Sequence, residues 1–444
     1  MIEPNGNGQA GRRPEPRADD PVFRQELKVR VHARLMETLD LVAAQRMAPA
    51  VLRDECARRV EHLLGEQRAP LTAAEKVQLL HEVLDEIFGL GPIEELMRDP
   101  AVTDILVNGP KQVYIEKGGR LTLSDVSFRD DKHLLAVIQR IAAGVGRRID
   151  ESSPMLDARL QDGSRVNAII PPLALHGAAM SVRRFAGVKI THERLIELQS
   201  WSEEMCTFLE AAVRCRANIV ISGGTGSGKT TLLNVLSRWI PPHERVVTIE
   251  DAAELMLQRD HVVSLETRPN NVEGKGEVTQ RDLLKNTLRM RPDRIIIGEV
   301  RGAEALDMLQ AMNTGHEGSM TTVHANSPRD ALRRIENMVS MAGLAYPVHV
   351  IREQMASTLD LVIQVERMSG GRRKIVSVVE ISGMEGDVIL LQELFTFRQS
   401  GLDAGGNALG SFDPCGVRPR FLDRMLKEGV QLPASTFQRK RRPG

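Results

Sequence analysis

The run from Gly223 to Thr230 reads G-G-T-G-S-G-K-T, which fits the G-x-x-x-x-G-K-[ST] pattern of a phosphate-binding loop. An apolar run at 219–221 precedes it, and a helix-like run at 232–236 follows it, as such a loop requires. Glycines let the backbone wrap a phosphate chain, so that amide N–H groups and a helix N-terminus face the negative charge. We therefore predict that the chain binds a nucleoside triphosphate.

The end of the run predicts which groups meet the phosphates and a metal ion. Lys229 is placed to reach the β- and γ-phosphates, and the hydroxyl of Thr230 is placed to ligate Mg²⁺. An idle glycine-rich turn is the alternative. The residues predicted to bind the nucleotide are Gly223, Gly224, Thr225, Gly226, Ser227, Gly228, Lys229, Thr230 and Thr231.

Hydrolysis of a terminal phosphate also needs a group that orients water. The run 294–299 (Arg-Ile-Ile-Ile-Gly-Glu) predicts a buried strand that ends in a carboxylate, as the second motif of a phosphate site does. Gly298 stands where most P-loop enzymes have an aspartate. Glu299 is therefore the residue predicted to polarise the attacking water or to hold it near the metal. An ordinary glutamate at a strand end is the alternative.

A second acidic pair, Glu250 and Asp251, ends the strand-like run 246–249. In a parallel sheet that end of the strand lies on the same edge as the phosphate-binding loop. We therefore predict that the side chains of this pair supply additional carboxylate groups for the metal ion. A helix N-cap is the rival role for Asp251, and both roles can hold. The predicted metal ligands are Thr230, Glu250, Asp251 and Glu299.

Histidines and arginines complete the set of candidate catalytic residues. His316 and His324 flank a predicted strand, and two histidines beside a nucleotide site favour γ-phosphate sensing by one of them, although an isolated histidine is usually structural. Arg159 and Arg165 bracket a turn at 161–164, and Arg301 follows the strand that ends at Glu299. On sequence alone, each of these arginines is expected to be a surface or ion-pair residue.

The composition bounds the class of protein. The 444 residues carry 59 basic and 59 acidic side chains, and this balance argues against a general nucleic-acid binder. The four cysteines are scattered, which fits reduced thiols rather than disulfides or a zinc site. No long apolar segment or signal-peptide core occurs. We therefore expect a soluble cytoplasmic protein that reaches membranes through partners.

A chain of this length must position these residues on two or three domains. Strand-like and helix-like runs alternate from Ala217 onward, which predicts an α/β fold with a mainly parallel sheet. A smaller α+β domain precedes it, opened by a capping box at Thr72–Glu75. The expected segments are a disordered tail (1–20), a helical extension (21–69), the α+β N-terminal domain (70–186), a linker (187–216), the P-loop domain (217–425) and a C-terminal tail (426–444).

Taken together, these motifs resemble the secretion-ATPase superfamily, the hexameric motors of type II and type IV secretion and of type IV pili. The resemblance rests on the loop, the acidic box 248–251, the strand 291–302 and the box 314–324. A glycine before the strand-end glutamate is the rule in that family. Finer resemblance at 89–109, 147–172, 380–395 and 416–421 points to the CpaF type, which drives assembly of Flp/Tad pili.

The resemblance implies an ATPase with a RecA-like C-terminal domain that uses ATP and Mg²⁺. It also implies a homohexamer with ATP between subunits, in which Arg159 and Arg165 of the N-terminal domain reach the phosphates. Such a motor is cytoplasmic and meets the inner membrane through platform proteins of a pilus or secretion machine.

Other interpretations stay open. A RecA-like motor on nucleic acid would need a basic path or stacking aromatics, and aromatic residues form 3% of the chain. A nucleotide-dependent scaffold without hydrolysis is a further alternative. Within the family, a role in type II or type IV secretion is also compatible with the motifs.

Overall fold

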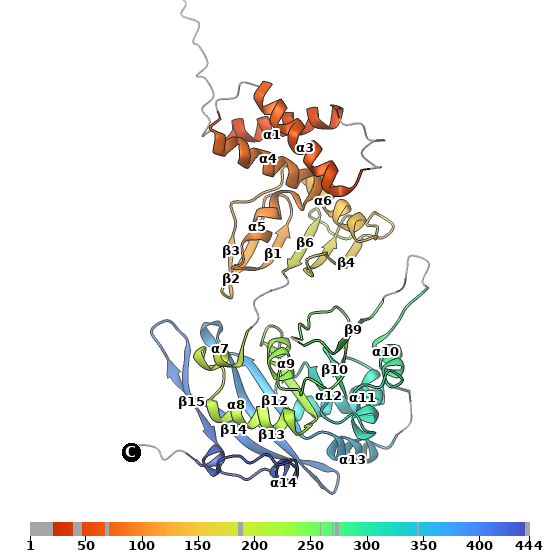
Figure 1. Cartoon of the computed structure of the whole chain (residues 1–444), viewed down its shortest axis with the longest axis vertical. Coiled ribbons are helices and arrows are strands. Elements are labelled where there is room, and N and C mark those ends of the chain that lie inside the picture. Colours follow the sequence, from red (N-terminus) through yellow and green to blue (C-terminus); the bar gives the residue numbers. More distant parts are fainter. Residues whose placement is uncertain are drawn as a thin grey trace, which may run out of the picture. The chain divides into compact units, whose positions relative to one another are not determined.

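The computed structural model describes residues 21–38, 47–66, 71–184, 190–257, 259–268, 270, 275–343 and 346–439. Contacts divide the chain into two compact units, Met1–Ala186 and Gly187–Gly444, and Figure 1 draws both. The predicted disordered tail at 1–20 lies outside the described residues, as do 187–189 of the predicted linker and 440–444 of the predicted C-terminal tail.

Three helices of the first unit share one apolar core, to which Leu27, Val60 and Leu79 each contribute from a different helix. The predicted capping box is confirmed, because the Glu75 amide donates to the Thr72 hydroxyl and the Thr72 amide donates to the Glu75 carboxylate. The helix that follows this box thus packs with the predicted extension. The three helices are α1 (Pro21–Thr38), α3 (Pro49–Glu66) and α4 (Ala73–Phe88).

The rest of the first unit is an α+β fold around a six-stranded antiparallel sheet with the strand order β3-β2-β1-β6-β5-β4. Its strands are β1 (Val102–Asn108), β2 (Val113–Lys117), β3 (Arg120–Leu123), β4 (Met155–Arg159), β5 (Arg165–Ile169) and β6 (Ala179–Arg183). Its helices are the short η1 (Gly91–Ile93), α5 (Glu94–Arg98) and α6 (Asp131–Gly144). Ile138 and Ile141 of α6 belong to the sheet's apolar core, so this helix covers one face.

The second unit is built on a nine-stranded sheet with the order β15-β14-β13-β12-β7-β11-β10-β8-β9. The neighbouring strands β12, β7, β11, β10, β8 and β9 run parallel to one another. Strands β13, β14 and β15 extend the sheet from β12 in antiparallel pairs. The strands are β7 (Ile219–Gly223), β8 (Val246–Glu250), β9 (Val262–Glu266), β10 (Arg294–Ile297), β11 (Met320–Val323), β12 (Leu361–Arg367), β13 (Arg373–Glu385), β14 (Val388–Leu402) and β15 (Ala408–Pro414). This is a RecA-like P-loop arrangement, in which β11 lies between the loop-bearing strand β7 and β10.

Helices cover both faces of this sheet, so the central strands are apolar on both sides. Along β7, Ile219 and Ile221 point into one core with helices α8 and α9, while Val220 points into the other core with α11, α12 and α13. The helices are α7 (His192–Glu197), α8 (Glu203–Arg214), α9 (Lys229–Ser237), α10 (Gln280–Thr287), α11 (Glu304–Asn313), α12 (Pro328–Ser340), α13 (Val348–Thr358) and α14 (Phe421–Lys427), with short turns η2 (Ser369–Gly371) and η3 (Ala434–Phe437).

Helix α8 lies in the segment that the sequence predicts as a linker. Its residues Met205, Phe208 and Leu209 are buried in the core of the second unit, where Phe208 packs against Phe395 and Phe437. This part of the segment is therefore a structural layer of the second unit. Within the described residues, no helix has the length and apolar character needed to cross a membrane.

Candidate active site

The predicted phosphate-binding loop joins β7 to α9 at the carboxyl edge of the parallel strands. Gly226 and Gly228 have φ angles of 68° and 98°, in the left-handed region that favours glycine. A Cβ atom on Gly223 would lie 2.4 Å from the carbonyl oxygen of Val365 on the neighbouring strand β12. The glycines at these positions thus follow from the backbone conformation and from close strand packing.

Lys229 folds back onto this loop. Its Nζ donates hydrogen bonds to the carbonyl oxygens of Gly223 and Gly224, each at 3.0 Å. Burial lowers the pKa of Lys229, and the nearby carboxylate of Glu299 opposes that shift. Thr230 and Thr231 follow Lys229 in the first turn of α9. An ammonium, hydroxyls and the N-terminus of a helix form a donor set that fits a polyphosphate with Mg²⁺.

Glu299 follows β10 at the same edge of the sheet. Its Oε2 accepts a 2.7 Å hydrogen bond from Nη2 of Arg301, and Nη1 of Arg301 lies 3.5 Å from Oδ2 of Asp251. One guanidinium therefore holds two of the predicted carboxylates together. The expectation that Arg301 is an ion-pair residue is confirmed.

Glu250 has a different environment from its neighbour Asp251. Its carboxylate is buried, and Oε1 accepts hydrogen bonds from the amides of Glu254 at 2.9 Å and Leu255 at 3.0 Å. One oxygen of this carboxylate thus holds the chain that follows β8. Asp251 is exposed, and its side chain accepts a hydrogen bond from Thr267, which ties it to the end of β9. The structure therefore brings Asp251 and Glu299 into one cluster, with Glu250 beneath it.

His324 lies between the loop and Glu299. Its Nε2 lies 3.2 Å from Oγ1 of Thr225, and its Nδ1 lies 3.8 Å from Oε1 of Glu299. Strand β11 lies between β7 and β10, so the residue that follows β11 is placed between the loop and Glu299. Burial lowers the pKa of His324, and the positive charge of Lys229 lowers it further. The carboxylate of Glu299 opposes this shift of the pKa, but the net effect favours the neutral imidazole.

His316 lies apart from this cluster, which corrects the expectation that both histidines flank the nucleotide site. It precedes β11, at the amino edge of the sheet, and its Nδ1 lies 3.3 Å from the carbonyl oxygen of Ala311. Its own carbonyl oxygen accepts a hydrogen bond from Ser319. The two histidines are separated because a strand carries its two ends to opposite edges of a sheet.

Arg159 and Arg165 belong to the sheet of the first unit, on β4 and β5. Nε of Arg159 lies 3.4 Å from the carbonyl oxygen of Gly163. Arg165 donates two hydrogen bonds to the carboxylate of Asp157, at 3.1 and 2.7 Å. Their contact with a nucleotide stays a prediction.

One residue at the loop escaped the sequence analysis. Nε of Arg373, the first residue of β13, donates a 2.9 Å hydrogen bond to the carbonyl oxygen of Gly226. These residues are 147 positions apart in the chain, and no local pattern marks Arg373. The order of the strands alone reveals this contact.

The predicted magnesium ligands do not form a closed metal site by themselves. Across the part of the chain that the structure describes, no group of three or more His, Cys, Asp or Glu side chains could hold a metal ion. Mg²⁺ in nucleotide sites is bound by one or two protein groups together with phosphate oxygens and water, so Thr230, Asp251 and Glu299 remain compatible with it.

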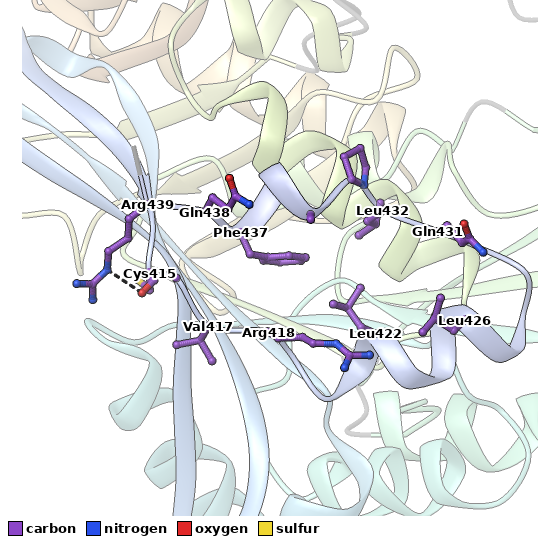
Figure 2. A pocket seen from close by; sticks show the side chains of 13 residues that line it. Cys415, Val417, Arg418, Leu422, Leu426, Gln431, Leu432, Phe437, Gln438 and Arg439 are labelled. Carbon is purple, nitrogen blue, oxygen red and sulfur yellow. Dashed lines mark hydrogen bonds between the residues drawn. The ribbon is translucent and has the colours of Figure 1, made fainter. Parts of the chain in front are cut away.

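A cavity of about 1040 Å³ lies elsewhere in the second unit, between the end of β15, α14 and η3. Figure 2 shows its lining, with apolar side chains such as Leu422, Leu432 and Phe437. Arg439 closes one end by donating a hydrogen bond to the carbonyl oxygen of Cys415. Its lining includes none of the predicted site residues, so we do not assign the chemistry to it.

Comparisons with known proteins identify related sequences. The sequence profile of the family described as "Type II/IV secretion system protein" matches residues 86–382. The chain is 35% identical over 289 residues to the conjugal transfer protein TrbB of Rhizobium radiobacter. This alignment covers 64% of this chain and 85% of TrbB. It is 32% identical over 306 residues to the type IV secretion system protein VirB11 of Brucella suis, over 63% of this chain and 84% of VirB11.

A solved structure gives a further likeness. The crystal structure of the VirB11 ATPase of Brucella suis in complex with sulphate aligns with a TM-score of 0.36 and 30% identity, over 66% of this chain and 97% of that one. The family profile spans the P-loop, both acidic motifs and the histidine box, and it matches more than half of the 444 residues. The chain belongs to the type II/IV secretion system protein family.

Proposed function

We propose that the chain is a motor ATPase that hydrolyses ATP to ADP and phosphate and powers assembly of a pilus or secretion of protein. The observation that carries this proposal is the position of His324 between Thr225 and Glu299 at the carboxyl edge of the sheet, beside Lys229. The phosphate-binding loop thus lies close to a carboxylate suited to water activation. Membership of the secretion system family supports the same function.

Each residue of this cluster has a distinct role in the proposed reaction. Lys229 leaves the carbonyl oxygens of its own loop and neutralises charge on the β- and γ-phosphates. Glu299 orients the attacking water, and neutral His324 is placed to sense the γ-phosphate. Thr230, with Asp251 or Glu299, would hold Mg²⁺, which supplies positive charge for the phosphate oxygens.

We further propose that the chain works as a homohexamer of the CpaF type, with ATP between subunits. Arg159 and Arg165 of a first unit would then reach the phosphates, and the two units would close on the nucleotide. Closure has a physical source, because a triphosphate bound from both units favours the closed state by its differential affinity. The motor would lie in the cytoplasm and act on platform proteins of a Flp/Tad pilus at the inner membrane.

Phosphate release by the purified full chain tests the core of the proposal. We expect Mg²⁺-dependent release from ATP by the wild-type chain and none above background from the Lys229→Ala variant. Equal release by both proteins, or none by the wild type, would contradict an ATPase. Stimulation by single-stranded DNA that falls with rising salt would instead favour a motor that acts on nucleic acid.

The biological role needs a test in cells. A strain that lacks the chain should lose surface pili and regain them with the wild-type gene, while the Lys229→Ala gene should fail to restore them. Normal piliation in the deletion strain would exclude the Flp/Tad assignment and leave a secretion role.

A further inference from the structure

The hairpin of β12 and β13 brings a pair of arginines to the phosphate-binding loop. Strand β12 is parallel to β7, with Val365 opposite Gly223, so its carboxyl end reaches the edge where the loop begins. Strand β13 runs back from the same edge, and Arg373 stands directly opposite Arg367 in the antiparallel register. The hairpin is thus fixed to the strand that carries the loop.

Arg373 contacts both left-handed glycines of the loop. Its Nε donates a 2.9 Å hydrogen bond to the carbonyl oxygen of Gly226. Its Cδ lies 3.2 Å from the position that a Cβ atom on Gly228 would take. The side chain therefore lies along the loop and touches it at the two residues that have positive φ.

Cross-strand pairing does not account for Arg373, because the residue directly opposite it, Arg367, carries the same charge. Within the described ranges, no carboxylate lies within ion-pair distance of Arg373, which is exposed. Its guanidinium is bonded instead to a carbonyl oxygen of the loop.

We propose that Arg373 is a positioning residue of the nucleotide site. By holding the carbonyl oxygen of Gly226, it keeps the amide groups of the loop turned toward the polyphosphate. The proposal rests on the proposed nucleotide-dependent function. Because Arg373 contacts the loop and not the γ-phosphate, it should strengthen the binding of ADP and of ATP equally. Its loss should therefore change kcat at saturating ATP only slightly.

The neighbouring residue offers a matched control. Arg372 is also exposed and lies in the same hairpin, but its Nη1 donates to Oε1 of Gln199 at 3.2 Å rather than to the loop. Arg372→Ala removes the same charge from the same place without removing the bond to Gly226. A long-range charge effect on nucleotide binding would therefore appear in both variants.

The experiment is to measure Kd for Mg·ADP and Mg·ATPγS by titration calorimetry, together with kcat and KM for ATP, on the full chain and its variants. Arg373→Ala should weaken the binding of both nucleotides about tenfold, as loss of one charge-assisted hydrogen bond does, with kcat changed less than about threefold. Arg373→Lys should recover part of the affinity, because an ammonium can donate to the same carbonyl. Arg372→Ala should leave both Kd values within about twofold of the wild type.

Three results would overturn the proposal. The first is unchanged affinity of Arg373→Ala while Lys229→Ala loses binding. The second is an equal loss in Arg373→Ala and Arg372→Ala. The third is a fall in kcat with unchanged affinity for ADP, which would make Arg373 a transition-state residue. Absence of nucleotide binding by the wild type would refute the proposed function as well, so the two failures are distinguishable.

Discussion

The side chain of Glu250 fills the space beside Gly298, on the strand next to its own. A Cβ atom at position 298 would lie 2.9 Å from Cγ and 3.2 Å from Oε1 of Glu250. Strands β8 and β10 are hydrogen-bonded neighbours, and the amide of Gly298 donates to the carbonyl oxygen of Ile249. Most P-loop enzymes place an aspartate where Gly298 stands, so here a carboxylate from the adjacent strand occupies that volume.

This relationship predicts that Gly298→Ala displaces Glu250. The added methyl group leaves no room for Cγ, and the displaced carboxylate would release the amides of Glu254 and Leu255. We expect a loss of about 1–3 kcal/mol in the free energy of unfolding, together with reduced ATPase activity. Urea unfolding followed by tryptophan fluorescence measures the loss, because Trp201 and Trp239 both lie in the core of the second unit.

A double-mutant cycle isolates the contact. In the Glu250→Ala background, Gly298→Ala should cost much less, because the clashing side chain is gone. Gly401→Ala, on β14 of the same unit, is the matched control, since a Cβ atom at that position meets no atom within 4 Å. An identical cost of Gly298→Ala in both backgrounds would contradict the steric explanation.

Glu299→Gln should separate nucleotide binding from hydrolysis. The amide keeps the size of the side chain but cannot act as a base, so we expect phosphate release to fall at least about a hundredfold while Kd for Mg·ATP stays within about threefold. Lys229→Ala should lose binding and turnover together. Calorimetry and a phosphate-release assay distinguish the two patterns. Wild-type turnover by Glu299→Gln would refute the role proposed for this residue.

Asp360 predicts a pH-dependent stability of the second unit. Burial raises its pKa to about 6, against the pull of the Asn218 amide and of Arg424. The folded state therefore binds a proton at Asp360 more tightly than the unfolded state does. The protonated carboxyl contributes fully to the free energy of unfolding below the pKa of the unfolded state, and this contribution is lost as pH rises through about 6. Asp360→Asn is neutral at every pH and should lack this loss.

The comparison is urea unfolding at pH 5 and pH 8. The stability of Asp360→Asn relative to the wild type should rise by about 1 kcal/mol between these two values. Asp387→Asn changes an exposed carboxylate in the same unit and should show no such rise. A difference between Asp360→Asn and wild type that is constant with pH would contradict the raised pKa.

The buried ion pair of Arg294 and Glu244 should be costly to break. Arg294 is fully buried at the start of β10, where it pairs with Glu244 and its Nη1 donates to the carbonyl oxygen of Val213 at 2.6 Å. Arg294→Met removes the fully buried one of two arginines that pair with Glu244, while the partly buried Arg216 still donates to Oε1 of this carboxylate. We expect a loss of about 3 kcal/mol in the free energy of unfolding, because one oxygen of a buried carboxylate then has no cationic partner.

Replacing both partners tests the reason for that loss. The double variant Arg294→Met/Glu244→Leu removes the buried carboxylate together with the arginine. Its stability should therefore lie closer to that of the wild type than the stability of Arg294→Met does. A double variant less stable than Arg294→Met would show that packing, rather than the uncompensated charge, sets the cost. Tryptophan fluorescence again reports on the correct unit.

Much of the second unit was predictable because its signals are local. The apolar run at 219–221 and the strand-like run at 246–249 lie within β7 and β8, and the run that starts at Arg294 forms β10. Strands β14 and β15 were not predicted, since both are largely exposed and their apolar residues are interrupted by polar and glycine residues. Helix α13 was also missed, because its pattern of buried residues is sparse.

The sequence by itself determined the loop, since glycines at fixed spacing specify positive φ angles and close packing whatever surrounds them. It also determined the strand-end position of Glu299 and the capping box at Thr72. The tertiary structure alone decided that β11 lies between β7 and β10, which places His324 between Thr225 and Glu299 and sends His316 to the other edge. It also brought Arg373 to Gly226. Strand order depends on packing between distant segments, and no local spacing encodes it.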